Sequence, residues 1–169
     1  MISSVRADGT NACMTIDSPT DGDVFLAFTE KVLVPSLRPG DIVIMDNLGA
    51  HKIEAVATQI AKAGATLAYL PAYSPDLNPI EKMWIKIKEF LLATKARTSE
   101  ALDAAIAAAF QSVTSQDAVS WFASCGYTIK QNALGCSRFV RAGRDLWLGE
   151  EVPDGPVRIP AKGFRLIRL

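Results

Sequence analysis

Several familiar signals are scarce or absent in this chain of 169 residues. No apolar run approaches the roughly 20 residues that a membrane-spanning helix needs, and the start lacks the long apolar stretch of a secretory signal. The three cysteines, Cys13, Cys125 and Cys136, form no C-x-x-C pair, which argues against a zinc site or a disulfide framework. We therefore predict a protein of the reducing cytoplasm that has no membrane partner.

A basic excess is also missing from most of the chain. Residues 1–127 contain ten Lys and Arg against fourteen Asp and Glu, whereas residues 128–169 contain eight against four. A protein that binds DNA through its phosphates usually has a basic face, and residues 1–127 offer only a local cluster of Lys82, Lys86 and Lys88. A strong DNA-binding module would have to lie elsewhere.

The composition, 49% hydrophobic and 21% charged, is typical of a globular protein, and the length suits one domain. From Thr128 onward, however, Gly and Pro interrupt every potential element and the arginines show no convincing period. We therefore place a boundary near residue 127. Residues 1–127 form the predicted domain, and residues 128–169 form a basic tail containing Gly and Pro that we expect to be weakly ordered and poorly packed.

The pattern of residues 1–127 predicts an α/β fold. Two loosely alternating segments flank Asp8-Gly9, which is a hairpin turn signal. Residues 41–46 and 66–70 are short apolar runs that suit strands of a parallel sheet buried on both faces. A helical pattern over 51–63 joins them, so we expect a right-handed β-α-β crossover.

Two acidic residues occupy positions where ligands bind in such sheets. Asp46 ends the first of the two apolar strands, and Glu81 lies in the first turn of a helix that we expect to begin at Pro79. Ligands of α/β sheets bind beyond the carboxyl ends of the strands, where loops and helix N-termini converge. Carboxylates that face each other repel, and divalent cations remove that cost. Oxygen-only ligands suit Mg²⁺ or Mn²⁺.

Both acidic residues also have structural explanations that remain open at this point. Asp46-Asn47 after a strand is ordinary turn chemistry. Asn78 can cap the helix that begins at Pro79, and Glu81 has the spacing of a capping-box partner.

The sequence motifs around the two acidic residues point to a family. The chain resembles the DDE transposases of bacterial insertion sequences, and within them the insertion sequence 630 family, which is related to the mariner-type elements. The resemblance covers about residues 2–127 and depends on two motifs, Asp46-Asn47-x-x-x-His51 and Leu70-Pro71-x-Tyr73-Ser74-Pro75-Asp76-Leu77-Asn78-Pro79-Ile80-Glu81-x-x-Trp84. The spacing of 34 residues between Asp46 and Glu81 is also that of the superfamily's second and third acidic residues.

The resemblance implies a ribonuclease-H-like mixed sheet flanked by helices. It also implies two Mg²⁺ (or Mn²⁺) ions and DNA as partner, with hydrolytic cutting at transposon ends followed by strand transfer. Asp46 and Glu81 are then metal ligands and catalytic residues, while Asn47, His51 and Asn78 are motif members near them. We expect Trp84 and Tyr73 to pack in the core and the loop rather than to stack on bases.

The chain departs from the family in two respects. The family's first catalytic aspartate lies on a strand upstream of the predicted hairpin, and no residue here matches it, because Asp8 and Asp17 stand in a turn and at a strand end. We therefore expect an N-terminally truncated fold whose missing first strand leaves a sheet edge unpaired. The helix-turn-helix region that binds transposon ends is missing too.

Three hypotheses follow. The chain is the second half of a transposase whose first half comes from an upstream frame, or works as a homo-oligomer. Alternatively, it is a non-enzymatic relic or regulator that pairs with intact transposase. The third hypothesis is an unrelated α/β binding domain.

Overall fold

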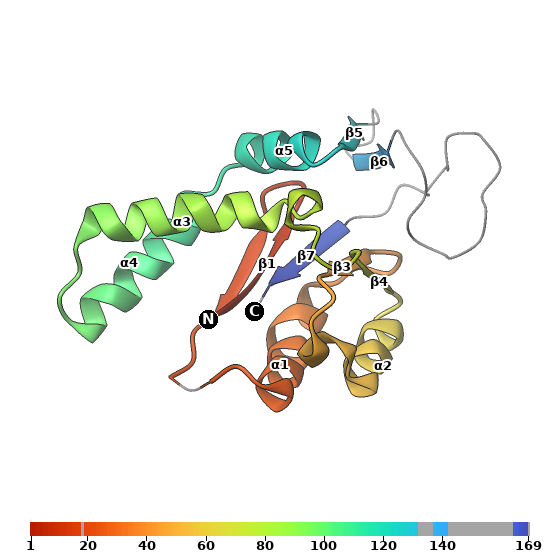
Figure 1. Cartoon of the computed structure of the whole chain (residues 1–169), viewed down its shortest axis with the longest axis horizontal. Helices are drawn as coiled ribbons and strands as arrows, with labels where there is room; N and C mark the ends of the chain where they lie inside the picture. The colour runs from red at the N-terminus through yellow and green to blue at the C-terminus, as the bar shows by residue number, and fades with distance from the viewer. Residues whose placement is uncertain (18, 132–136, 142–163, 169) are drawn as a thin grey trace.

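A five-stranded mixed sheet forms the centre of the protein (Figure 1). The structure, a computed structural model, describes residues 1–17, 19–131, 137–141 and 164–168. The strand order is β2-β1-β7-β3-β4. The strands are β1 (Ile2–Arg6), β2 (Asn11–Met14), β3 (Ile42–Met45), β4 (Thr66–Tyr69) and β7 (Phe164–Arg168). The α/β class predicted from the sequence is thus confirmed.

The predicted hairpin is confirmed. Strands β1 and β2 pair antiparallel, with Ile2 opposite Met14. Gly9 in the turn between them has φ +88, a conformation that favours glycine because a Cβ atom is strained there. The Asp8 carboxylate accepts a hydrogen bond from the Thr10 N–H at 2.8 Å, which closes the turn.

The predicted parallel strand pair is confirmed as well. Strands β3 and β4 run parallel, with Ile42 opposite Thr66 and Met45 opposite Tyr69. The short helix η3 (Gly49–Lys52) and helix α2 (Glu54–Lys62) connect them. Because parallel strands end at the same edge of a sheet, the residues after β3 and β4 lie at a common edge.

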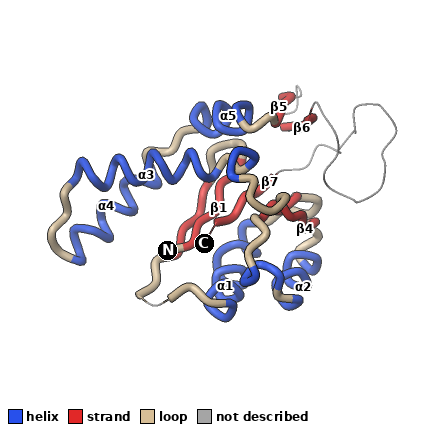
Figure 2. The backbone as a smooth tube through the Cα atoms, in the orientation of Figure 1, coloured by secondary structure: helices blue, strands red, loops and turns tan. Residues whose placement is uncertain are grey.

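Helices cover both faces of the sheet (Figures 1 and 2). On one face, Val43 and Met45 share a core cluster with Phe25, Phe28 and Val56. This face is covered by α1 (Gly22–Phe28), the π-helical η1 (Thr29–Leu33), η2 (Val34–Ser36) and α2. On the other face, Val5 and Ile44 share a cluster with residues of the remaining helices. These are η4 (Pro75–Leu77), α3 (Ile80–Thr94), α4 (Ser99–Gln111) and α5 (Ser115–Ser124).

The strand order overturns the expectation that a missing first strand leaves a sheet edge unpaired. No edge is left open between β1 and β3, because β7 pairs antiparallel with β1 and parallel with β3. A strand from the segment 128–169 therefore lies in the middle of the sheet. A separate pair, β5 (Tyr127–Gln131) and β6 (Ser137–Arg141), is antiparallel. The boundary near residue 127 stays a prediction.

None of the helices in the described part of the chain has the length and apolar character needed to span a membrane.

Candidate functional site

Asp46 is the residue that directly follows β3. Its side chain is 30% exposed, and its Oδ1 lies 2.6 Å from Nδ1 of His51. The Leu48 N–H reaches the same oxygen at 3.4 Å. None of the residues that the structure describes forms a hydrogen bond or ion pair with Oδ2, so this oxygen has a lone pair for a further ligand.

His51 is fully buried and holds Asp46 in place. Its Nδ1 lies 3.2 Å from the Asp46 carbonyl oxygen as well as close to the carboxylate. Both partners are acceptors, so the ring must have its proton on Nδ1. Nε2 is buried and has no hydrogen-bond partner among the described residues. The ring packs against Phe25, with 4.3 Å between the ring centroids.

Tyr69, the last residue of β4, holds in place the loop that follows the neighbouring strand β3. Its hydroxyl donates to the His51 carbonyl oxygen at 2.9 Å. Burial raises the pKa of Tyr69, so the hydroxyl remains a donor at neutral pH. Neither Tyr69 nor Phe25 stood out in the sequence, since an aromatic residue in an apolar stretch gives no local sign of its partner.

Glu81 lies in the first turn of α3 and is half-buried. Ile80 directly before it and Ile44, two residues before Asp46, belong to the same core cluster. Asp46 itself lies one residue beyond β3, and its partner His51 packs against Phe25 of the other core cluster. Glu81 thus directly follows a residue of the core cluster on the α3 side, while Asp46 follows the strand that contributes Ile44 to it.

The capping interpretation of Asn78 is wrong. Its backbone is extended and Pro79 has helical torsion angles, as expected for a helix start. However, the Glu81 N–H donates to the Asn78 backbone carbonyl at 3.1 Å. The buried Oδ1 of the Asn78 side chain accepts no bond from any described residue. The backbone oxygen thus takes the hydrogen that the side chain needs for a capping box.

Three other motif residues have clear positions. Asn47 is exposed next to Asp46. Trp84 is buried and packs edge-on against Phe110 at 6.2 Å, which confirms its predicted packing role. Tyr73, in contrast, is fully exposed and has φ 57, so its predicted packing role is wrong.

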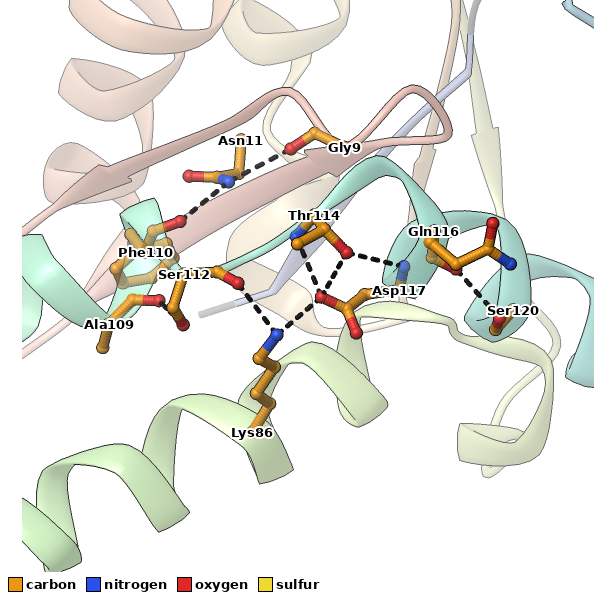
Figure 3. A network of polar contacts seen from close by, with 10 residues as sticks. All are labelled: Gly9, Asn11, Lys86, Ala109, Phe110, Ser112, Thr114, Gln116, Asp117 and Ser120. Atoms are coloured by element: carbon orange, nitrogen blue, oxygen red, sulfur yellow. Dashed lines mark hydrogen bonds and ion pairs between the residues drawn. The ribbon is translucent and has the colours of Figure 1, made fainter.

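One member of the local lysine cluster, Lys86, has a structural role. Nζ of Lys86 donates to the Ser112 carbonyl at 2.8 Å and to Oδ2 of Asp117 at 2.6 Å (Figure 3). The Lys86 hydrogen bond, followed by the Thr114 N–H, lowers the pKa of Asp117 to about 2. Lys86 therefore joins α3 to the start of α5 and is not free for a phosphate.

The described residues do not provide ligands for a pair of metal ions. The described residues contain no group of three or more His, Cys, Asp or Glu side chains that could hold a metal ion. The Asp46 carboxylate, whose Oδ2 forms no hydrogen bond or ion pair with a described residue, suits an oxygen-preferring divalent cation. A site for two ions about 3.5–4 Å apart needs more ligands than this, so the residues present do not fit the complete pair of ions.

Comparison with known families agrees with the sequence motifs. The family model described as DDE superfamily endonuclease matches residues 1–103, which is more than half of the chain. This match includes β1 to β4, Asp46 and Glu81, and excludes β7. No curated protein matches the chain.

Proposed function

Since the chain belongs to the DDE superfamily endonucleases, we propose that it is part of a bacterial insertion-sequence transposase of the insertion sequence 630 family. Its fold would be ribonuclease-H-like. The protein would act in the bacterial cytoplasm, associated with the nucleoid when bound to DNA. Its DNA partners would be the transposon ends and the target.

We assign Asp46 and Glu81 as ligands of Mg²⁺ or Mn²⁺. The observation that supports this most directly is the state of Asp46 at the carboxyl end of a parallel strand, with one oxygen held by His51 and the other open. In a site of this class a divalent cation activates the attacking oxygen and stabilises the leaving one. Asn47 and Asn78 would contribute only to the shape of the loops.

The chain by itself would be inactive. Three carboxylates normally hold the ions in this chemistry, and the described residues contain no such group. We therefore derive no reaction step for the isolated chain. Activity would require a partner that completes the site, either an upstream-frame half or a second copy.

The same observation favours a second function. A chain that retains the family fold but lacks a complete metal site can pair with intact transposase and block it, as a regulator or a relic. The two functions differ in one respect, because only the first predicts that a completed assembly cuts DNA.

Metal binding provides the first test. Mn²⁺ binding by the full chain is titrated for the natural sequence, Asp46→Asn and Glu81→Gln, with Asp103→Asn on the exposed surface of α4 as matched control. We expect both site variants to weaken binding by roughly tenfold, since each removes a charge next to the ion, and the control to leave it unchanged. Helicity should be the same in all four. Equal affinities in all four would refute the assignment.

Cleavage provides the second test. Incubation of the full chain with Mg²⁺ or Mn²⁺ and transposon-end DNA should leave the DNA intact. Cutting that Asp46→Asn abolishes would show that the isolated chain is an active nuclease.

A further inference from the structure

One loop, residues 70–79, leads from β4 to α3 along the edge of the sheet that carries the candidate site (Figure 1). At its start, the Leu70 N–H donates to the Met45 carbonyl oxygen at 2.7 Å, so the loop leaves the sheet next to Asp46. At its end, it continues into the first turn of α3, which contains Glu81. The loop therefore lies at the carboxyl ends of β3 and β4, where ligands of α/β sheets bind.

Tyr73 in this loop presents its whole side chain to solvent. The side chain is 102% exposed, so no described residue covers either face of its ring. Leu48, two residues after Asp46 on the loop that follows β3, is 47% exposed. The edge that carries Asp46 thus also offers an aromatic face without a protein partner among the described residues.

The backbone of Tyr73 is held in an unfavourable conformation. Its φ is 57, in the left-handed region, where a bulky residue is rare. Lys95 is the other described non-glycine residue with a positive φ, and it has a structural reason. It is the C-cap of α3, and its N–H donates to the Leu91 carbonyl oxygen at 3.3 Å. Tyr73 ends no helix, and its ring gains no packing in return. Such strain is typical of active sites and ligand clamps.

The charges at this edge favour contact with a nucleobase over contact with a phosphate. Three carboxylates, those of Asp46, Asp76 and Glu81, stand against the two nearby lysines Lys52 and Lys82. A phosphate is therefore repelled unless a cation is bound. The face of a nucleobase is uncharged, and stacking on an aromatic ring tolerates any base. Stacking gives an edge without a basic excess a way to hold DNA.

We propose that Tyr73 stacks on an unpaired nucleobase of the DNA and thereby holds the strand beside Asp46. This inference rests on the proposed function, because it names the form of DNA that the same site takes. In a duplex the faces of each base are covered by its neighbours, so only a base that has left the stack can lie on the ring. The tyrosine acts by binding, and no bond forms or breaks in this step.

The test is binding of the full chain to a short single strand that carries a fluorescent adenine analogue, whose emission is quenched by stacking. Tyr73→Ala should lower the affinity roughly tenfold and remove the quenching, because one stacked base is lost. Tyr73→Phe and Tyr73→Trp retain an aromatic ring and should retain both signals. The matched control is Leu92→Ala, which removes another exposed apolar side chain, 76% exposed on α3. It should bind as the natural chain does.

Salt and strand pairing distinguish stacking from contact with phosphates. The ring of Tyr73 has no charge, so the ratio of the affinities of the natural chain and Tyr73→Ala should be the same at low and high salt. A contact with a phosphate would weaken as salt is added. A blunt duplex of the same sequence offers no open base, and the natural chain and Tyr73→Ala should bind it equally.

Several outcomes overturn the inference. These are equal single-strand affinities of the natural chain and Tyr73→Ala, no single-strand binding by the natural chain, and a loss in Tyr73→Phe equal to that in Tyr73→Ala. A changed oligomeric state of Tyr73→Ala in analytical ultracentrifugation also overturns it, since the ring would then belong to a protein interface. Circular dichroism checks the fold of each variant.

The Mn²⁺ titration of Asp46→Asn and Glu81→Gln tests the proposed function separately. If neither variant weakens Mn²⁺ binding, the proposed function fails, whatever the single-strand experiment shows. If both weaken it while Tyr73→Ala binds the single strand as the natural chain does, the metal site stands and only the stacking role of Tyr73 is lost.

Discussion

Strand β3 has an aspartate at each end, and the protein holds the two in opposite ways. Asp41 is 1% exposed and uses both carboxylate oxygens, which accept hydrogen bonds from the Arg6 guanidinium and from the Arg38 N–H at 2.9 Å. Among the described residues, Asp46 has partners at Oδ1, namely His51 and the Leu48 N–H, and its side chain is 30% exposed. The same residue type thus has a closed environment at one end of the strand and an open one at the other.

This difference distinguishes a structural aspartate, Asp41, from a candidate metal ligand, Asp46. A buried carboxylate that a guanidinium grips with two hydrogen bonds has its charge neutralised within the protein. Asp46 is oriented by an imidazole N–H and retains an oxygen that forms no hydrogen bond or ion pair with a described residue. An acid that is positioned but not neutralised is suited to a cation from solution.

The largest effect is expected from Asp41→Ala. Removal of one partner of a buried ion pair leaves the Arg6 charge without compensation and costs about 3–5 kcal/mol of unfolding free energy. Urea unfolding followed by circular dichroism measures this loss. The paired replacement Arg6→Leu with Asp41→Leu removes both charges and should recover much of it. A loss below about 1 kcal/mol for Asp41→Ala would show that the pair does not hold β1 and β3 together.

A smaller effect is expected from His51→Ala. The change removes a fully buried ring that packs against Phe25, which should lower the unfolding free energy by about 2 kcal/mol. His51→Phe keeps an aromatic ring but loses the Nδ1–H donor, so it should cost only about 1 kcal/mol while still weakening Mn²⁺ binding. If His51→Phe binds Mn²⁺ as the natural chain does, His51 serves packing alone.

The Lys86–Asp117 pair should contribute about 1 kcal/mol, because both side chains are partly exposed. The pKa of Asp117 is lowered to about 2 from 3.8. Its contribution is therefore complete above about pH 3.8 and is lost as the pH falls through 2. Urea unfolding of Lys86→Met between pH 7 and pH 2 should show a weaker dependence on acid than the natural chain. Parallel curves for the two proteins would contradict this role.

The smallest effect on stability is expected from Asp46→Asn. The amide retains an oxygen acceptor for the His51 N–H, so the unfolding free energy should change by less than about 0.5 kcal/mol. Thermal and urea unfolding without metal measure this change. A loss comparable to that of Asp41→Ala would show that the two ends of β3 are both structural, and that the contrast between them is not functional.

Local patterns predicted much of residues 1–127. The Asp8-Gly9 turn, the parallel strands and the helix after Pro79 all follow from periodicities and turn residues that lie within a few positions of each other. The sequence also placed Asp46 at a strand end and Glu81 in a first helical turn, where the structure has them. It did not predict α5 as a separate helix, whose Thr114–Asp117 capping box begins only after α4 has ended.

The sequence by itself therefore determined the hairpin, the parallel strands, the helix after Pro79 and the placement of the two acids along them, because these depend on contacts between near neighbours in the chain. The tertiary structure alone decided what surrounds each acid. Arg6 meets Asp41 across 35 positions, and β7 enters the sheet from a segment rich in Gly and Pro that reads locally as irregular. Every non-proline residue offers the same backbone donor and acceptor, so the local sequence does not show that Phe164–Arg168 pairs with β1 and β3.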